Sequence, residues 1–305
     1  MITMRNSPRI AAVALTSFVA CLVACEDDHG GFTDEAVEIA FEARVGDLPF
    51  ACGESYTGLG SDGAGATPQD LRFYVHDVRL VTDDGEEHPV DLEDDGVYQG
   101  GGAALLDFED GSGACTNGTA QLHTTLKGTV RAQPRHGGGE GGYSEIRFRI
   151  GVPEDQNHAD LTTLPAPLND TTMSWSWNAG HIFFAAWGVF GGDSPFPIGV
   201  HVGSTGCMGD AMLGEVVSCS KPNRPEIALA GFDHDTSTIV VDWGALFADL
   251  GVTAPPAACE EVEGETSCAC HSFGPGPLCS PLFATLGLDW SSGEVTAGQS
   301  LFRVQ

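Results

Sequence analysis

Two segments, residues 173–187 and 200–207, concentrate the side chains that could take part in metal or redox chemistry. The first holds three of the chain's five tryptophans together with a methionine and a histidine. Its candidate metal ligands and oxidisable side chains are Met173, Trp175, Trp177 and His181. The second segment, Val-His-Val-Gly-Ser-Thr-Gly-Cys, contains His201. We interpret the two segments as parts of a metal site inside a disulfide-braced β-protein. The alternative is an aromatic core with a histidine at its edge.

Two further histidines extend the predicted site. His158 lies in a long loop over 153–169 that is bounded by prolines, where a ligand can be positioned. His201 lies on the strand face opposite to the flanking valines, so we expect it to point away from the apolar face. His123 lies on a threonine-rich strand. The predicted metal ligands are His201, His158, Met173, His181 and His123, although Met173 also fits a core position.

Residues 1–24 have the pattern of a bacterial lipoprotein signal peptide. Two arginines precede a short apolar run, which is too short to span a bilayer, and the tetrapeptide Leu-Val-Ala-Cys ends at Cys25. We expect lipidation of Cys25, an acidic flexible tether over 25–35 and a single domain over 36–305. An ordinary signal peptide with a chance cysteine is the alternative. The prediction is an outer-membrane lipoprotein, in the periplasm or at the cell surface, that contacts membrane through its N-terminal lipid only.

Charge and missing motifs exclude several classes of function. The chain has 43 acidic and 13 basic residues, for a formal net charge of −30, and such a surface repels nucleic acid and anionic lipid. It contains no Gly-x-Ser-x-Gly elbow, EF-hand loop or phosphate-binding loop with its lysine. We therefore expect a binding protein rather than an enzyme, with no nucleic-acid partner.

Eight cysteines follow Cys25, and an even number in an exported chain predicts disulfides. They are Cys52, Cys115, Cys207, Cys219, Cys259, Cys268, Cys270 and Cys279. The sequence Cys-Ala-Cys-His ending at His271 is one residue short of a haem-attachment motif, so we exclude c-type haem, whereas a zinc knuckle is an open alternative. Free thiolates are rare in an oxidising compartment, so histidine and methionine are the expected ligands.

Many short alternating segments separated by glycine turns predict an all-β fold. The expected strands cover 37–45, 71–81, 90–92, 103–108, 121–130, 143–152, 173–177, 182–187, 196–202, 226–230 and 238–243. A change of phase in the second of these predicts a β-bulge near His76 and Asp77. We expect helix only at 244–250 and 281–286, a flexible glycine-rich connection at 58–67, and irregular structure at 255–277. The predicted fold is a disulfide-braced antiparallel β-sandwich with long loops and one or two short helices.

An ordered series of short motifs runs from about Val37 to Phe302. The motifs are Phe50-Ala-Cys52-Gly, Asp70-Leu-Arg-Phe-Tyr-Val, Ala104-Leu-Leu-Asp-Phe-Glu, Asn157-His-Ala-Asp160, Pro167-Leu-Asn, Met173-Ser-Trp-Ser-Trp with Gly180, His201-Val-Gly-Ser-Thr-Gly-Cys207, Cys219 with Pro222-Asn-Arg, and Cys279-Ser-Pro-Leu-Phe. In this order they resemble the MbnP-like family, the four-Cys proteins of the bacterial "metallo-mystery pair" system. Each motif is short, and it is the ordered set that makes the resemblance specific.

The resemblance implies an exported copper-binding protein that works with a di-haem, cytochrome-c-peroxidase-like partner of the MbnH-like type. It implies that such a partner can oxidise a tryptophan to kynurenine, with Trp175 and Trp177 as the candidates. It also implies four disulfides, namely Cys52–Cys115, Cys207–Cys219, Cys270–Cys279 and Cys259–Cys268. The predicted function is copper storage, transfer or acquisition, and the alternative is a surface-binding or structural β-sandwich module without a metal.

Three positions depart from the family's pattern. His181 stands where relatives often have tyrosine, Tyr98 precedes Gln99 where they often have tryptophan, and His76 stands where a small polar residue is common. If the tryptophan that relatives have at the position of Tyr98 is the one that is oxidised, this chain lacks the kynurenine chemistry.

Overall fold

The computed structural model describes the chain from residue 33 to residue 305 with short gaps. The described residues are 33–115, 117–132, 142–176, 178–192, 194–210, 213, 215, 217–257, 259–262, 265–272, 276–296 and 298–305. The signal peptide expected over 1–24, the lipidation site Cys25 and Trp177 lie outside the described residues. Strand structure already begins at Thr33, inside the range expected to be a tether.

Strand β4 (Ala64–Thr82) is the centre of the fold, because five other strands pair with it. Its register against strand β9 shifts between His76 and Arg79, and Asp77 there has a φ of 50°. The β-bulge expected near His76 is therefore confirmed. A bulge bends a strand and increases its twist, so β4 changes direction at this point.

The other elements are short. The strands that flank β4 in sequence are β1 (Thr33–Val45), β2 (Leu48–Pro49), β3 (Tyr56–Leu59), β5 (Glu87–Leu92), β6 (Gln99–Gly100), β7 (Ala103–Asp107), β8 (Thr125–Ala132) and β9 (Tyr143–Ile150). The next strands are β10 (Ser174–Ser176), β11 (Gly180–His181), β12 (Phe184–Phe190), β13 (Phe196–Val202), β14 (Thr205–Met208) and β15 (Ser218–Lys221). The last strands are β16 (Glu226–Ala230), β17 (Thr238–Asp242), β18 (Glu260–Val262), β19 (Glu265–His271) and β20 (Phe302–Val304). The helical elements are α1 (Gly276–Thr285) and the 3₁₀ turns η1 (Thr171–Met173) and η3 (Ala245–Phe247).

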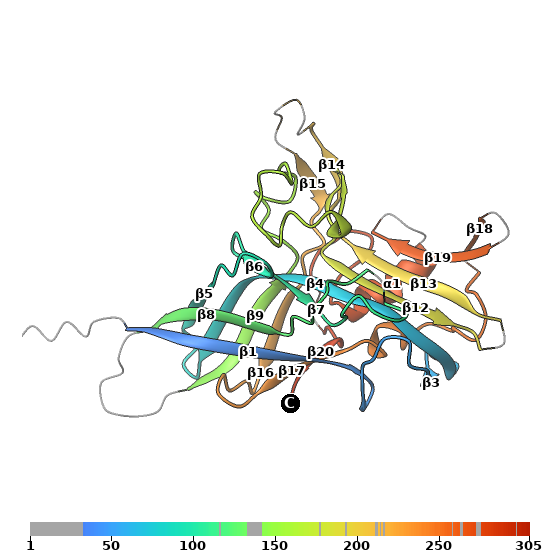
Figure 1. Cartoon of the computed structure of the whole chain (residues 1–305), viewed down its shortest axis with the longest axis horizontal. Coiled ribbons are helices and arrows are strands. Elements are labelled where there is room, and N and C mark those ends of the chain that lie inside the picture. Colours follow the sequence, from blue (N-terminus) through green and yellow to red (C-terminus); the bar gives the residue numbers. More distant parts are fainter. Residues whose placement is uncertain are drawn as a thin grey trace, which may run out of the picture. The chain divides into compact units, whose positions relative to one another are not determined.

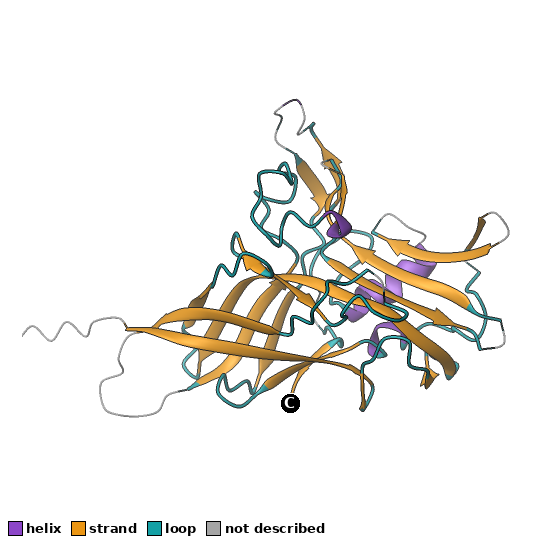
Figure 2. Ribbon diagram, viewed as in Figure 1, coloured by secondary structure: helices purple, strands orange, loops and turns teal. Residues whose placement is uncertain are grey.

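Most of these strands belong to one mixed sheet, which Figures 1 and 2 show as a curled ribbon of strands. Its main path runs β18-β19-β13-β12-β4-β5-β8-β1-β17-β20. Among the described strands, only β1 with β17 and β13 with β19 pair in parallel. The expected all-β, disulfide-braced character is confirmed, but the plain antiparallel sandwich is not. Because β4 continues through its bulge with partners along its whole length, the hydrogen bonding stays continuous and the sheet curls into a half-barrel.

Aromatic side chains fill the concave side of this sheet. Phe73 of β4 lies 6.4 Å from Phe41 of β1, 5.6 Å from Phe184 of β12 and 5.5 Å from Phe302 of β20, measured between ring centroids. All four rings are buried, and aromatic pairs at such distances stabilise a core beyond the effect of their buried area. This packing fixes β12 against β4, and β12 in turn holds β13.

Two segments that the sequence predicts as irregular contain strands. Residues 58–67 include the end of β3 and the start of β4, joined by a tight turn in which Gly63 has a φ of 73°. Residues 255–277 contain β18 and β19, because β19 pairs with the distant strand β13. The expected helix at 244–250 is only the turn η3, whereas the one at 281–286 is part of the longer α1. No helix in the described part of the chain has both the length and the apolar character needed to cross a bilayer.

Four disulfides connect the described segments, and their pairs agree with those that the resemblance implies. They are Cys52–Cys115, Cys207–Cys219, Cys259–Cys268 and Cys270–Cys279. Disulfides of this number form and persist in oxidising compartments. The folded chain is therefore an extracytoplasmic protein.

Candidate metal centre

The parallel strands β13 and β19 present two histidines side by side. His201 of β13 is the direct cross-strand partner of His271 of β19. Their Nδ1 atoms lie 3.2 Å apart, and their ring centroids are separated by 5.0 Å. Directly paired residues on neighbouring strands point to the same face of a sheet. Two imidazole donors, of the kind that copper and zinc bind, therefore meet at one point.

The sequence predicts His201 as a ligand and offers His271 only through the zinc-knuckle alternative. That alternative is wrong, because Cys268 and Cys270 form disulfides with Cys259 and Cys279. The two histidines are 70 positions apart. Around His271 the local signal is a short alternation, since Cys268 and Cys270 are buried. This alternation indicates a strand, but it does not identify the strand that lies next to it.

Both imidazoles are uncharged at neutral pH. Burial, followed by repulsion from His271, lowers the pKa of His201 to about 4, with Asp70 acting in the opposite direction. Burial also lowers the pKa of His271. Metal coordination requires a neutral imidazole with a free lone pair. Across the 3.2 Å contact one Nδ1 donates its proton to the other, so a metal ion that takes both nitrogens requires this proton to move to Nε2 of the same ring.

The spacing of the pair also suits a metal ion. A metal–nitrogen bond is about 2.0–2.1 Å long, so two such bonds can span more than the 3.2 Å between the two Nδ1 atoms. One ion can contact both nitrogens without the strands moving apart. The residues present therefore fit a transition-metal ion at this position.

Two tryptophans flank the histidine pair. The ring of Trp187 on β12 lies 6.3 Å from that of His201, and the ring of Trp175 on β10 lies 6.4 Å from that of His271. Gly199 makes room for Trp187, because a Cβ atom at this position would lie 1.8 Å from the indole ring. Trp175, one of the two predicted oxidation targets, therefore lies beside the histidine pair.

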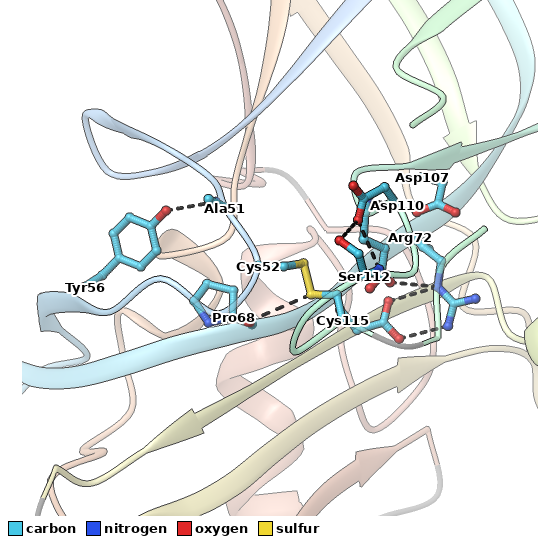
Figure 3. Close-up of a disulfide and its surroundings, with 11 residues drawn as sticks. Ala51, Cys52, Tyr56, Pro68, Arg72, Asp107, Asp110, Ser112 and Cys115 are labelled. Atoms are coloured by element: carbon cyan, nitrogen blue, oxygen red, sulfur yellow. Dashed lines mark hydrogen bonds and ion pairs between the residues drawn. A yellow bond between two sulfur atoms is a disulfide. The ribbon is translucent and has the colours of Figure 1, made fainter. Parts of the chain in front are cut away.

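A buried charge cluster lies on the other side of β12. Arg72 of β4 contacts both carboxylate oxygens of Asp70, at 3.0 and 2.9 Å, and its Nε lies 3.2 Å from Glu109 Oε1. Figure 3 shows Arg72 among carboxylates beside Cys115. Ala185 of β12 is paired with Arg72 on one side and with His201 on the other. The small alanine therefore separates the guanidinium group from the imidazole.

His158 belongs to a second group of potential ligands. Its Nε2 lies 3.2 Å from Cys219 Sγ, and one donor atom each of His158, Cys207 and Cys219 lie within 4.8 Å of one another. Among the described residues, no such group joins His158 with His201 and His271. The two strongest ligand candidates from the sequence thus lie in separate donor groups.

Asn157 holds the ring of His158 in place. The backbone N–H of His181 donates to Asn157 Oδ1 at 3.0 Å, so the amide nitrogen is the atom that faces His158 Nε2, also at 3.0 Å. Gly180 permits this approach, because a Cβ atom there would lie 2.6 Å from Asn157 Oδ1. Since the amide nitrogen donates, His158 Nε2 accepts and carries a lone pair rather than a proton.

The other predicted ligands are anchored by different contacts. The ring nitrogens of buried His181 lie 3.0 and 2.8 Å from two backbone carbonyl oxygens. His123 contacts a backbone carbonyl oxygen through Nδ1 at 2.6 Å and stacks on Tyr98 with 4.6 Å between ring centroids. Met173 is fully buried in the apolar core. In the described part of the chain, neither His181 nor His123 joins a group of three donors.

Comparison with known proteins gives one family and one solved structure. A family model described as MbnP matches residues 34–262. The solved structure of MbnP from Methylosinus trichosporium superposes with a TM-score of 0.71 at 26% sequence identity, over 89% of this chain and 98% of that chain. No curated protein matches the chain.

Proposed function

Because this chain belongs to the MbnP family, we propose that it is an exported copper-binding protein whose ligands include the imidazoles of His201 and His271. The observation that carries the proposal is the pair of neutral ring nitrogens 3.2 Å apart on neighbouring strands. Imidazole is a ligand that suits copper, so a copper site at this position does not need a thiolate. Bound copper would supply a centre for one-electron transfer.

The surroundings of the pair support retention of copper rather than catalysis. Trp187 and Trp175 lie beside the two rings, and an aromatic lining limits the access of water and of further ligands. The nearby ion pair of Arg72 with Asp70 is buried, so it acts on the site through its fixed charges rather than by moving. We propose copper storage, transfer or acquisition as the role, without an enzymatic reaction.

We also propose that Trp175 is the target of an oxidising partner. The expected partner is a di-haem, cytochrome-c-peroxidase-like protein of the MbnH-like type, with hydrogen peroxide as the oxidant. Two molecules of peroxide would add two oxygen atoms across the indole C2–C3 bond, cleave that bond and leave two molecules of water. Hydrolysis of the formyl group would then release formate and leave kynurenine. The position of Trp175 beside His271 supports this target.

Export and anchoring complete the proposal. The disulfides support an oxidising compartment, and the predicted lipobox supports attachment through Cys25 to the outer membrane, facing the periplasm or the cell surface. The whole chain has a net charge of −30, so the acidic domain would remain off the lipid surface and would concentrate cations around itself.

Substitution of the two histidines tests the copper proposal. The full mature chain is loaded with Cu(I) and titrated with a chromophoric Cu(I) chelator. We expect one bound copper in the wild type. Loss of a residue that only orients a metal ligand lowers metal affinity by roughly 10–100-fold. His201→Ala and His271→Ala each remove a ligand itself, so each should lower the copper affinity by more than this. His88→Ala, which removes a half-buried histidine from β5 and belongs to none of the donor groups among the described residues, is the matched control and should leave the affinity unchanged.

His158→Ala separates the two donor groups in the same titration. If His201 and His271 are the ligands, the oxidised His158→Ala protein keeps its copper. Unchanged copper binding in a His201→Ala, His271→Ala double variant would reject the assigned ligands. Intact-mass measurement after exposure to the partner and peroxide would show whether Trp175 becomes kynurenine, with Trp175→Phe as the control.

A further inference from the structure

The Cys207–Cys219 disulfide differs from the other three in its accessibility. It joins β14 to β15, which form a two-stranded sheet of their own rather than part of the main sheet. Figure 1 shows this hairpin standing away from the larger sheet. Both of its cysteines are only half-buried. Every other disulfide contains at least one cysteine with no exposed surface, namely Cys115, Cys268, or both Cys270 and Cys279.

A histidine nitrogen lies against this accessible disulfide. His158 Nε2 is 3.2 Å from Cys219 Sγ, and its orientation is fixed by Asn157. In the oxidised protein the two sulfur atoms are bonded to each other and are poor ligands. Reduction would convert them to thiols, and thiolate sulfur is among the preferred ligands of soft cations. The same three residues would then offer one nitrogen and two sulfurs within 4.8 Å.

The hairpin is held together at its base by contacts that do not depend on the disulfide. Ser204 Oγ donates to the Pro222 carbonyl oxygen at 2.9 Å, and Asn223 Nδ2 donates to the Gly203 carbonyl oxygen at 2.7 Å. Cys207 and Cys219 are direct cross-strand partners in the ladder above this base. After reduction the two sulfurs therefore stay opposite each other and next to His158.

We infer that Cys207, Cys219 and His158 form a second, reduction-gated metal site for a soft cation such as Cu(I). The reductant is a dithiol. It attacks the Cys207–Cys219 bond through a mixed disulfide and ends with its own sulfurs joined, having given two electrons and two protons to the cysteines. The cation then displaces the two thiol protons, replaces the Asn157 amide as the partner of the Nε2 lone pair, and takes both sulfurs and His158 Nε2 as ligands. This inference does not rest on copper binding by His201 and His271.

The test uses Cd²⁺ as a probe of thiolate ligation. The full mature chain is reduced with an excess of phosphine reductant, which is removed without oxygen before Cd²⁺ is added. Peptide mapping after alkylation identifies the reduced cysteines. We expect Cys207 and Cys219 to be alkylated first, and the reduced protein to gain one Cd²⁺ with thiolate-to-metal absorption. The oxidised protein should show no such absorption, whatever its imidazoles bind.

Two variants and a control make the result specific. His158→Ala keeps both thiols but should bind the reduction-dependent Cd²⁺ more than about 10-fold more weakly, because one ligand is lost. Cys207→Ser with Cys219→Ser should abolish the absorption, and His88→Ala, outside the donor groups of the described residues, should equal the wild type. Circular dichroism shows whether the His158→Ala protein is folded. If it is not, the His158→Gln variant takes its place in the Cd²⁺ titration.

Three outcomes would overturn the inference. One is reduced wild-type protein without an additional thiolate-bound Cd²⁺. Another is equal Cd²⁺ affinity in His158→Ala and the wild type. The third is a Cys207–Cys219 bond that survives conditions in which a buried disulfide is already reduced. Loss of copper from the His201→Ala variant would have no bearing on any of these measurements, so the two proposals fail independently.

Discussion

Glu109 is a buried carboxylic acid that shares its surroundings with another acid. Burial, followed by a hydrogen bond and charge repulsion from Asp70, raises the pKa of Glu109 to about 10. Glu109 is therefore protonated at neutral pH, while Asp70 stays ionised against Arg72. Of these three side chains next to the histidine pair, Arg72 is thus a cation, Asp70 an anion and Glu109 a neutral acid.

The pH dependence of unfolding follows from this raised pKa. A group whose pKa is higher in the folded than in the unfolded state stabilises the fold fully below its unfolded pKa, and the effect is lost as the pH rises through the folded value. The window for Glu109 runs from about 4.5 to about 10. Glu109→Gln keeps a donor for Asp70 and an acceptor for Arg72, but it does not titrate. We expect wild-type stability to fall relative to the variant by up to about 1.4 kcal/mol per pH unit across this window.

Denaturant unfolding of both proteins between pH 5 and pH 9 measures this difference. Parallel curves of unfolding free energy against pH would show that Glu109 is already ionised at neutral pH. Glu109→Ala is the structural control, because it removes the hydrogen-bonding groups as well as the titration and should destabilise the fold at every pH.

Single residues explain why only one member of the His201–His271 pair was predicted from the sequence. His201 lies next to valines in a clear alternation, so its strand face could be predicted. His271 becomes a partner of His201 only because β19 lies parallel to β13, and no local pattern encodes a partner 70 residues away. His158 was predicted as a ligand from its loop, but its contact with Cys219 depends on Asn157 and on the fold of the β14–β15 hairpin.

At the scale of elements, the bulge in β4 places a histidine inside the protein. His76 is buried, and its Nδ1 lies 2.8 Å from the Gly151 carbonyl oxygen. Burial is the main cause that lowers the pKa of His76 to about 4, and the nearby Arg224 and Arg149 act in the same direction. The neutral ring donates its single proton to the carbonyl group and joins β4 to the end of β9.

Acid should therefore weaken this junction. The pKa of His76 is lower in the folded state than the value of 6.5 for an unperturbed histidine, so its contribution is complete above about pH 6.5 and is lost as the pH falls through about 4. His76→Asn keeps a donor near the position of Nδ1 but does not titrate. We expect the unfolding free energy of the wild type to fall more steeply than that of the variant between pH 6.5 and pH 4, as measured by urea unfolding. Equal slopes would mean that His76 is protonated without cost.

The elements that the sequence predicted well are those with a local signal. Strands β13 and β16 have the expected bounds, since apolar alternation marks them and turns enclose them. Strand β19 was missed because its residues are mostly small or polar and because β13, its partner, is remote. The curl of the sheet was missed for a similar reason. A sequence pattern shows which residues face the core, but not whether one strand continues through a bulge into both halves of a sheet.

At the scale of the whole molecule, the disulfides enclose loops of very different length. Cys52–Cys115 spans 63 residues, whereas Cys270–Cys279 spans 9. The loss of chain entropy in the unfolded state grows with loop length, so removal of the first pair with serine should cost about 4 kcal/mol and removal of the second about 3 kcal/mol. Guanidinium unfolding of the two double-serine variants measures the order. A larger cost for the short loop would show that contacts in the folded state, rather than loop entropy, dominate.

The parallel junction of β13 with β19 sets an order of events during secretion. A polypeptide leaves its translocation channel from the N-terminus onward, and His271 emerges 70 residues after His201. Until β19 has crossed and paired with β13, the emerging segment carries a single imidazole at this position. Under the proposed function the copper site is therefore completed only after β19 has been delivered and has paired with β13, so we expect copper to be loaded outside the cytoplasm.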